Sequence, residues 1–187
     1  FGNIVDYGTQ GISAEQMVPD IVELADDDDI KAMVLRVNSG GGSAFASEQI
    51  WEALQYFKSK GKKLYVSMGD YAASGGYYIS CGADRIYAEP VTLTGSIGIF
   101  GMIPCAKQLA DNIGVNMSIV TTNNGNAAFP NLFDPMTPAQ RNAMQREVNN
   151  GYELFTRRCA DGRGIPQDSI KAIGQGRVWD GIMAKKI

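Results

Sequence analysis

The chain contains no histidine, and this absence restricts its chemistry more than any other feature of its composition. Without histidine, the chain cannot build a Ser-His-Asp triad or a Cys-His pair from its own residues. The commonest metal ligand is also missing, and we expect neither a metal site nor a cofactor. If the protein carries out nucleophilic chemistry, a group other than imidazole must accept the proton.

Other features are scarce as well. The three cysteines, Cys81, Cys105 and Cys159, lie in apolar surroundings without CxxC spacing, so we expect buried free thiols rather than disulfides or a zinc site. No apolar run approaches the roughly 20 residues that span a bilayer. The net charge is -3 and no basic patch is visible, so we do not expect nucleic-acid binding.

Strands alternate with helices along the 187 residues, which are enough for one domain with a sizeable core. Apolar runs predict strands, the first two buried on both faces, at residues 30–37, 63–68, 85–88 and 115–121. Helical spacing and glycine or capping signals predict helices at residues 13–25, 44–60, 76–81, 105–112 and 137–160. The alternation indicates an α/β fold with a largely parallel sheet.

Two of these helices carry start and stop signals. Capping boxes are predicted at Ser13 and at Thr137, where Ser or Thr stands three residues before Gln. The last helix should pack an apolar stripe, residues 144–159, into the core and end at Gly162 and Gly164.

Two glycine-rich segments, residues 38–42 and 72–76, follow the first two predicted strands. Parallel sheets place their ligand sites at such carboxyl ends. In the second segment, small residues flank the hydroxyl of Ser74 on a strand-to-helix turn, a setting that suits a nucleophile. The bare N–H groups of the first could form an oxyanion hole. The first segment alone is more typical of a turn and the second of a helix cap, but the two together favour a catalytic site. A phosphate loop is disfavoured because GxxxxGK[ST] is absent.

Several runs together resemble one family. They are VLRVNSGGGS, SMGDYAASGGYYIS, LTGSIGIFG, MTPAQ, NGYELF and GQGRVWDGIMAKK, between about Ile30 and Lys186. The chain is similar to signal peptide peptidase A (protease IV), most of all to the C-terminal half of its long two-repeat form. The resemblance implies the Clp-protease/crotonase-like fold, a twisted α/β sheet with flanking helices. It also implies cleavage of signal peptides and other unfolded peptides by a Ser nucleophile with a Lys general base.

Carried onto this sequence, the resemblance assigns roles to five residues. The serine of the A-A-S-G-G motif falls on Ser74, the nucleophile. The oxyanion hole falls on the N–H groups of Gly42 and Gly75, with Gly41 as a further candidate. The serine of T-G-S-I-G, which orients the Lys amine, falls on Ser96.

The chain departs from the family's pattern at two points. The proline of N-S-P-G-G is Gly40 here, which makes the first loop more flexible. No lysine stands between Lys107 and Lys171, where one-repeat members carry the base. In the two-repeat form this half carries Ser and the N-terminal half carries Lys. The chain by itself is therefore predicted to be inactive, because the Lys must come from outside it.

The resemblance sets the remaining expectations. Residues 1–187 form a single peptidase domain fragment that begins without Met. Its partners are peptide substrates, the N-terminal half of the same protein and further copies in a tetramer or ring. It works on the extracytoplasmic face of the cell membrane, anchored through a segment outside the chain.

Two alternatives stay open. One is a crotonase-type acyl-CoA enzyme, which the A-A-S-G-G and T-G-S-I-G runs argue against. The other is a non-catalytic assembly domain, which the missing base favours. A Clp-type peptidase within the chain is excluded by the missing histidine.

Overall fold

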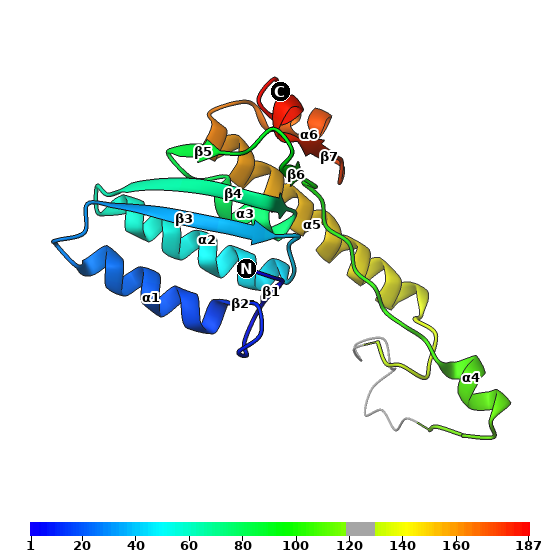
Figure 1. Cartoon of the computed structure of the whole chain (residues 1–187). Coiled ribbons are helices and arrows are strands. Elements are labelled where there is room, and N and C mark those ends of the chain that lie inside the picture. The colour runs from blue at the N-terminus through cyan, green and yellow to red at the C-terminus, as the bar shows by residue number, and fades with distance from the viewer. Residues whose placement is uncertain (119–129) are drawn as a thin grey trace. The chain divides into compact units, whose positions relative to one another are not determined.

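The computed structural model describes residues 1–118 and 130–187, and the described chain falls into two compact units (Figure 1). Unit 1 comprises residues 1–99 and 152–187, and unit 2 comprises residues 100–151. Unit 2 contains the helix α4 (Lys107–Asn112) and the first part of α5 (Pro138–Arg163), whose last part belongs to unit 1. All the candidate site residues lie in unit 1.

Unit 1 alternates strands and helices, as predicted. Its elements in chain order are β1 (Ile4–Val5), β2 (Ile12–Ser13), α1 (Ala14–Asp26), β3 (Ala32–Ser39), α2 (Ala44–Ser59), β4 (Lys63–Ala73), α3 (Gly75–Ser80), β5 (Arg85–Tyr87), β6 (Leu93–Gly95), α6 (Gln167–Ile173), β7 (Val178–Asp180) and α7 (Gly181–Ala184). The main sheet has the order β3-β4-β6-β7, with β5 also paired to β4. Every pair is parallel except β6 with β7, which confirms the largely parallel sheet.

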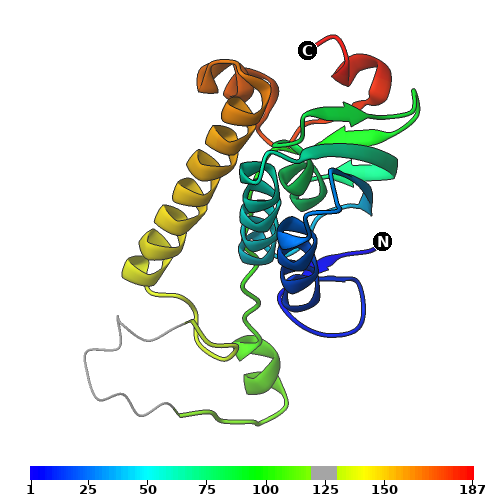
Figure 2. The ribbon, with the colours of Figure 1, turned by 90° about the vertical axis from the view of Figure 1, so that its left-hand side faces the viewer.

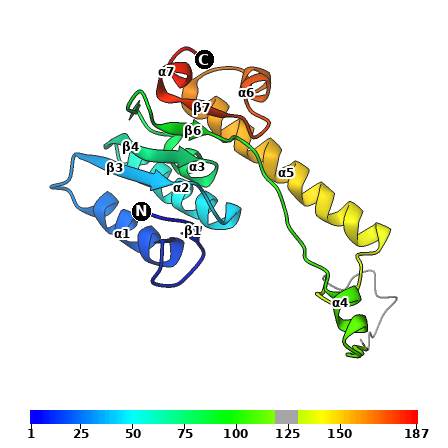
Figure 3. The same cartoon turned by 45° about the vertical axis from the view of Figure 1, so that its right-hand side comes forward.

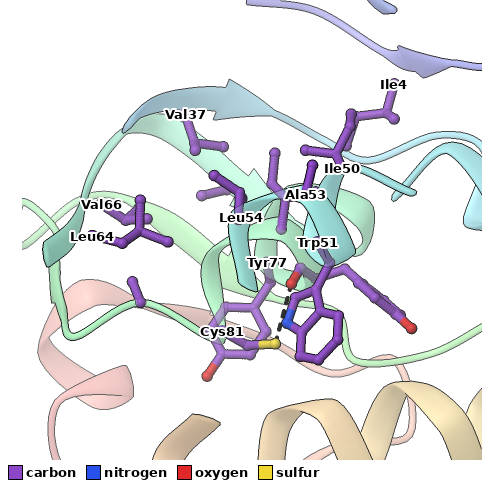
Figure 4. Close-up of a cluster of buried hydrophobic side chains, with 14 of the residues drawn as sticks. Ile4, Val37, Ile50, Trp51, Ala53, Leu54, Leu64, Val66, Tyr77 and Cys81 are labelled. Atoms are coloured by element: carbon purple, nitrogen blue, oxygen red, sulfur yellow. Dashed lines mark hydrogen bonds between the residues drawn. The ribbon is translucent and has the colours of Figure 1, made fainter. Parts of the chain in front are cut away.

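The core lies between the sheet and the helices α1 and α2, which run side by side on one of its faces (Figure 2). Ile50 and Leu54 of α2 are fully buried against strand residues such as Val37, Leu64 and Val66 (Figure 4). Burial of each such side chain stabilises the fold by roughly 1.5–3 kcal/mol.

The prediction that the first two strands are buried on both faces is wrong. Alternate residues of β3 are exposed, and Val34 keeps 68% of its surface accessible. On β4, Leu64, Val66 and Met68 are buried, whereas the residues between them are not. The reason is that helices of unit 1 pack on the face that carries the buried residues. The apolar runs therefore predicted the strands correctly, but helices cover only one face of them.

Strand β4 is longer than predicted and ends directly before Ser74. The apolar run stops at Met68, but the strand continues to Ala73. A register shift in β3 between Val37 and Ser39 brings Ser39 opposite Ala72, and β6 pairs with the last three residues of β4. Pairing with β6, which apolar content does not reveal, therefore extends the strand to the site.

Helix ends were predicted with mixed success. The capping box at Thr137 is confirmed: Thr137 Oγ1 accepts from the Gln140 N–H at 3.2 Å, and Gln140 Oε1 accepts from the Thr137 N–H at 2.9 Å. The capping box predicted at Ser13 is wrong. The buried Ser13 hydroxyl makes no hydrogen bond to any residue that the structure describes, and the Gln16 side chain donates to the Gly8 oxygen instead. Ser13 still occupies the N-cap position by its backbone.

The C-terminal part of α5 crosses α3 at close range. Gly162 lies inside α5 rather than ending it, so that prediction is wrong. The residue is glycine because an added Cβ would stand 2.0 Å from the Cys81 carbonyl oxygen. Phe155 and Cys159 on the same face are buried, whereas Met144 and Val148 of the predicted stripe are only partly buried.

The predicted thiols are free, but not all of them are buried. Cys81 and Cys159 are buried in the core, and burial raises the pKa of the Cys159 thiol well above its ordinary value. Cys105 is exposed, so the prediction is wrong there. The segment that contains it was apolar in sequence but lies outside the core cluster. Residues 115–118 form no strand, and the rest of the strand predicted at 115–121 lies outside the described residues.

Candidate active site

The turn at Ser74 has an unusual backbone. Ser74 joins β4 to α3 with φ 52° and ψ −120°, a conformation that residues other than glycine rarely adopt. Such strain costs about 1–3 kcal/mol and typically marks functional sites, including the nucleophile turns of hydrolases. Two hydrogen bonds hold it, from the Ser74 N–H to the Gly95 oxygen at 2.9 Å and from the Tyr78 N–H to the Ser74 oxygen at 2.8 Å.

The hydroxyl of Ser74 is not used by the turn itself. Ser74 stands at the N-cap position of α3, but its side chain makes no capping hydrogen bond, and Oγ has no partner among residues 1–118 and 130–187. The interpretation as an ordinary helix cap is therefore excluded. Because α3 has only 6 residues, its dipole is small, and individual N–H groups must supply any stabilisation of negative charge.

The glycines after Ser74 allow close packing of α3. An added Cβ would lie 2.6 Å from Ser47 Oγ at Gly75, and 2.6 Å from the Ser39 carbonyl oxygen at Gly76. Larger residues would push the start of α3 away from α2 and from the end of β3. The two glycines of the A-A-S-G-G run are thus required by the contacts on which the turn rests.

The two glycine-rich segments meet, as the parallel sheet predicted. A Cβ at Gly41 would lie 2.7 Å from the Gly75 nitrogen and 3.1 Å from Ser74 Oγ. Gly41 has φ 105°, which disfavours any other residue. The first loop therefore passes directly beside the candidate nucleophile.

The N–H groups of this loop differ in their availability. The Gly41 N–H donates to Ser39 Oγ at 3.1 Å, so it is already engaged. The N–H groups of Gly42 and Gly75 have no acceptor within the part of the chain that the structure describes. Gly41 is bonded directly to Gly42, and its Cβ position lies 2.7 Å from the Gly75 nitrogen, so both donors belong to residues next to the contact between Gly41 and Ser74. The contacts favour Gly42 and Gly75 over Gly41 as an oxyanion hole.

Ser96 lies at the same edge of the sheet as Ser74. In the register of β4 and β6, Ala73 pairs with Gly95, so Ser74 and Ser96 each follow a paired residue. Ser96 also has positive φ, 48°, and its N–H donates to the Arg177 oxygen at 2.7 Å. Its half-buried hydroxyl has no partner among the described residues.

Two lysines of unit 1, Lys63 and Lys171, form ion pairs and are poor candidates for the base of Ser74. Lys63 begins β4 and Ala73 ends it, so extended strand geometry separates them by roughly 30 Å. Lys63 forms an ion pair with Asp84 at 3.4 Å. Lys171 pairs with Glu153 at 2.8 Å, and this hydrogen bond raises the pKa of its amine rather than lowering it.

A polar cluster missed in the sequence secures the helix that follows Ser74. Tyr78 of α3 donates its hydroxyl to Glu48 of α2 at 2.5 Å, and Arg158 of α5 forms an ion pair with the same carboxylate. The Arg158 guanidinium also stacks on the Trp51 ring at 4.0 Å. Burial and the neighbouring Glu48 raise the pKa of Tyr78, which keeps it a hydrogen-bond donor. No motif marked these residues, because they lie on three separate elements.

A groove of about 440 Å³ lies between the start of α1 and the first turn of α2. The exposed rings of Tyr7 and Phe45 contribute to its lining, and Phe45 follows the first glycine-rich loop by only a few residues.

Across residues 1–118 and 130–187, no cluster of side chains could hold a metal ion. None of the described helices combines the length and apolarity that crossing a membrane requires.

A serine on a strained strand-to-helix turn, with two backbone donors beside it, defines a candidate acyl-transfer site on an α/β fold. Comparison with known proteins narrows this class. The model of "Peptidase family S49" matches residues 56–187, and that of "Clp protease" matches residues 6–91. The chain belongs to peptidase family S49, a family of serine peptidases.

Individual relatives and structures agree with this assignment. Protease 4 of Salmonella typhi is 44% identical over 85% of this chain and 25% of its own length. A putative signal peptide peptidase SppA of Enterococcus faecium is 30% identical over 98% of this chain and 55% of its own length. The structure of a mutant ClpP1 from Listeria monocytogenes, at 15% identity, has a TM-score of 0.63 over 100% of this chain and 83% of its own. The Clp-protease fold is thus confirmed, and the chain spans only part of the length of these curated relatives.

Proposed function

We propose that the chain is the serine-bearing part of an endopeptidase that works with a Ser-Lys dyad. Ser74 is the nucleophile, Gly42 and Gly75 supply the oxyanion hole, and Ser96 orients the amine of the Lys. The observation that carries the proposal is the strained turn at Ser74, whose free hydroxyl lies beside the first glycine-rich loop, near two residues, Gly42 and Gly75, whose N–H groups have no acceptor among the described residues.

In the proposed reaction, a neutral Lys amine takes the proton from Ser74 Oγ as Oγ attacks the peptide carbonyl carbon. The carbonyl oxygen becomes an oxyanion and accepts hydrogen bonds from the N–H groups of Gly42 and Gly75. The protonated amine then gives its proton to the leaving nitrogen, and the C–N bond breaks. Water attacks the acyl-Ser74 ester through the same steps, which releases the product and restores the hydroxyl.

The Lys comes from a related N-terminal repeat of the complete protein. Support for this comes from the lysine-free stretch 108–170 and from the far end of β4, where Lys63 stands. Burial beside Ser96 would lower the pKa of an incoming Lys enough to leave part of it neutral.

The proposal extends to substrates, assembly and location. Signal peptides and other unfolded peptides are the substrates, and the apolar groove beside Phe45 suits their apolar segments. The complete protein forms a tetramer or ring on the extracytoplasmic face of the cell membrane, anchored through a segment outside residues 1–187. It needs no cofactor.

Labelling with a fluorophosphonate in the complete protein tests the proposal. We expect covalent modification at Ser74 and loss of both labelling and peptide cleavage in Ser74→Ala, with fold and assembly unchanged because a loop hydroxyl adds little to packing. Cleavage retained in Ser74→Ala would refute the proposal. An unlabelled, inactive wild type would favour an assembly domain, and coenzyme A binding by calorimetry would favour a crotonase-type enzyme.

A further inference from the structure

The N-terminal segment of the chain lies along the first glycine-rich loop (Figure 3). The Gly2 N–H donates to the Asn38 oxygen at 3.1 Å, and the Ile4 N–H donates to the Gly41 oxygen at 2.9 Å. In return, the Ser43 N–H donates to the Ile4 oxygen at 2.8 Å. Ile4 and Gly42 thus form a parallel β-bridge outside the main sheet.

This bridge fixes the orientation of one peptide group. In a trans peptide the C=O and N–H bonds point in opposite directions. Because the Gly41 carbonyl points toward Ile4, the Gly42 N–H of the same peptide points away from β1. The Gly41 Cα on that peptide touches the turn at Ser74 and Gly75.

Besides Ile4, the Ser39 hydroxyl contacts this peptide: Ser39 Oγ lies 3.5 Å from the Gly41 oxygen, longer than the 2.9 Å hydrogen bond from Ile4. Gly40 is exposed, and an added Cβ there would meet nothing within 4 Å. Gly41 and Gly42 both have positive φ, 105° and 154°, and glycine crosses between positive and negative φ at little cost. A flip of the peptide would replace the Gly42 N–H with the Gly41 carbonyl oxygen, which repels an oxyanion.

The side chain of Ile4 reaches the second loop. Ile4 is only 1% exposed, and its Cδ1 lies 3.2 Å from the Cβ position of Gly75. The backbone of Ile4 also requires glycine at position 42, since an added Cβ there would stand 2.0 Å from the Ile4 oxygen. Ile4 therefore binds the peptide that carries the Gly42 N–H and also packs beside Gly75.

We propose that Ile4 is a positioning residue for the oxyanion hole: its N–H holds the Gly41–Gly42 peptide with the Gly42 N–H available, and its side chain supports Gly75. This inference rests on the proposed function. It gives Ile4, which lies before the first helix, a role in the proposed reaction although Ile4 need not touch the substrate.

The test is Ile4→Pro in the complete protein, which removes the N–H that binds Gly41. Asn3→Pro is the matched control, because the Asn3 N–H has no acceptor among the described residues. Loss of one oxyanion donor lowers kcat about 100- to 1000-fold. We expect this loss in Ile4→Pro at nearly unchanged KM, with equal weakening of a peptide aldehyde that forms a tetrahedral adduct, and near-native kinetics in Asn3→Pro.

Two outcomes would overturn the inference. One is equal kcat in Ile4→Pro and Asn3→Pro. The other is a raised KM in Ile4→Pro together with an affinity for the aldehyde that falls no more than the affinity for the substrate, because this pattern indicates a general loosening of the site. If Ile4→Pro does not fold, Ile4→Gly replaces it, because it retains the N–H but loses the support under Gly75. Its kcat should fall about 10-fold at unchanged KM, and native kcat would refute the role. Ser74→Ala in parallel separates the two levels: if it stays active, the proposed function itself has failed.

Discussion

Gly40 and Gly41 are adjacent in the sequence but stand in opposite environments, so alanine at each position gives a matched pair of variants. A Cβ at Gly40 meets nothing within 4 Å and its φ is not positive. A Cβ at Gly41 would lie 2.7 Å from the Gly75 nitrogen and 2.8 Å from Ser74 Cβ. Both variants add the same methyl group to the same loop.

The expected magnitudes follow from these contacts. In Gly41→Ala, the φ of 105° costs about 1–3 kcal/mol. The methyl group must also displace the Ser74–Gly75 turn by roughly 0.7 Å to reach ordinary contact distance. Misplacement of a reacting group by about 1 Å can cost about 100-fold in rate. Gly40→Ala should be neutral or stabilise by about 0.4–1 kcal/mol through the unfolded chain.

The assay measures the rate of fluorophosphonate labelling, kcat/KM for a peptide substrate and the melting temperature, all on the complete protein. We expect Gly41→Ala to lose about 100-fold in labelling and turnover and to melt at a lower temperature, and Gly40→Ala to behave as wild type in rate. Equal labelling rates in the two variants would refute the placement of the first loop beside Ser74.

Three further outcomes are expected. Ser96→Ala in the complete protein should lower kcat about 10- to 1000-fold with little change in KM, whereas Ser96→Thr keeps the hydroxyl and most of the activity; equal, near-native kcat in both would reduce Ser96 to a turn residue. The 187-residue chain alone should not hydrolyse peptides; turnover abolished by Ser74→Ala would contradict the external base. Asp84 accepts the Leu64 N–H at 2.9 Å, and this bond, with nearby lysines, lowers its pKa below 3.8. Because the pKa of Asp84 is lower in the folded protein, the ionised carboxylate stabilises the fold at neutral pH, and this stabilisation is lost as the pH falls through the folded pKa. Asp84→Asn should lower the melting temperature at pH 7 and have little effect in strong acid. An equal difference in melting temperature between wild type and variant at both pH values would refute a stabilising role of the Asp84 charge.

Much of the site could be predicted because its signals are local. Ser74 and the glycines beside it stand directly after apolar runs, and carboxyl ends of parallel strands share one edge of a sheet. This rule places Ser74 and the first glycine-rich loop at the same edge, and the structure adds the contact between Ser74 and Gly41. Ser96 lies at the expected edge of the sheet as well, although the short strand before it was not identified as such.

Other parts could not be predicted, since their signals are spread over distant segments. The contact of Ile4 with Gly41 joins residues that no motif connects. The cluster of Glu48, Tyr78 and Arg158 draws on three helices. The exposure of Val34 depends on which face of the sheet the helices cover.

The sequence by itself determined the chemistry that this chain can supply: without histidine, and with a serine among small residues, it restricted the nucleophile and excluded an imidazole base from the chain's own residues. Only the tertiary structure decided the directions of the groups involved. Whether the Ser74 hydroxyl caps a helix or stays free, and whether the Gly42 N–H points toward the site or away from it, depends on backbone torsions. Glycine and strained serine leave those torsions open, and hydrogen bonds that join Ser74 to Gly95 and Gly41 to Ile4, distant in the chain, fix them.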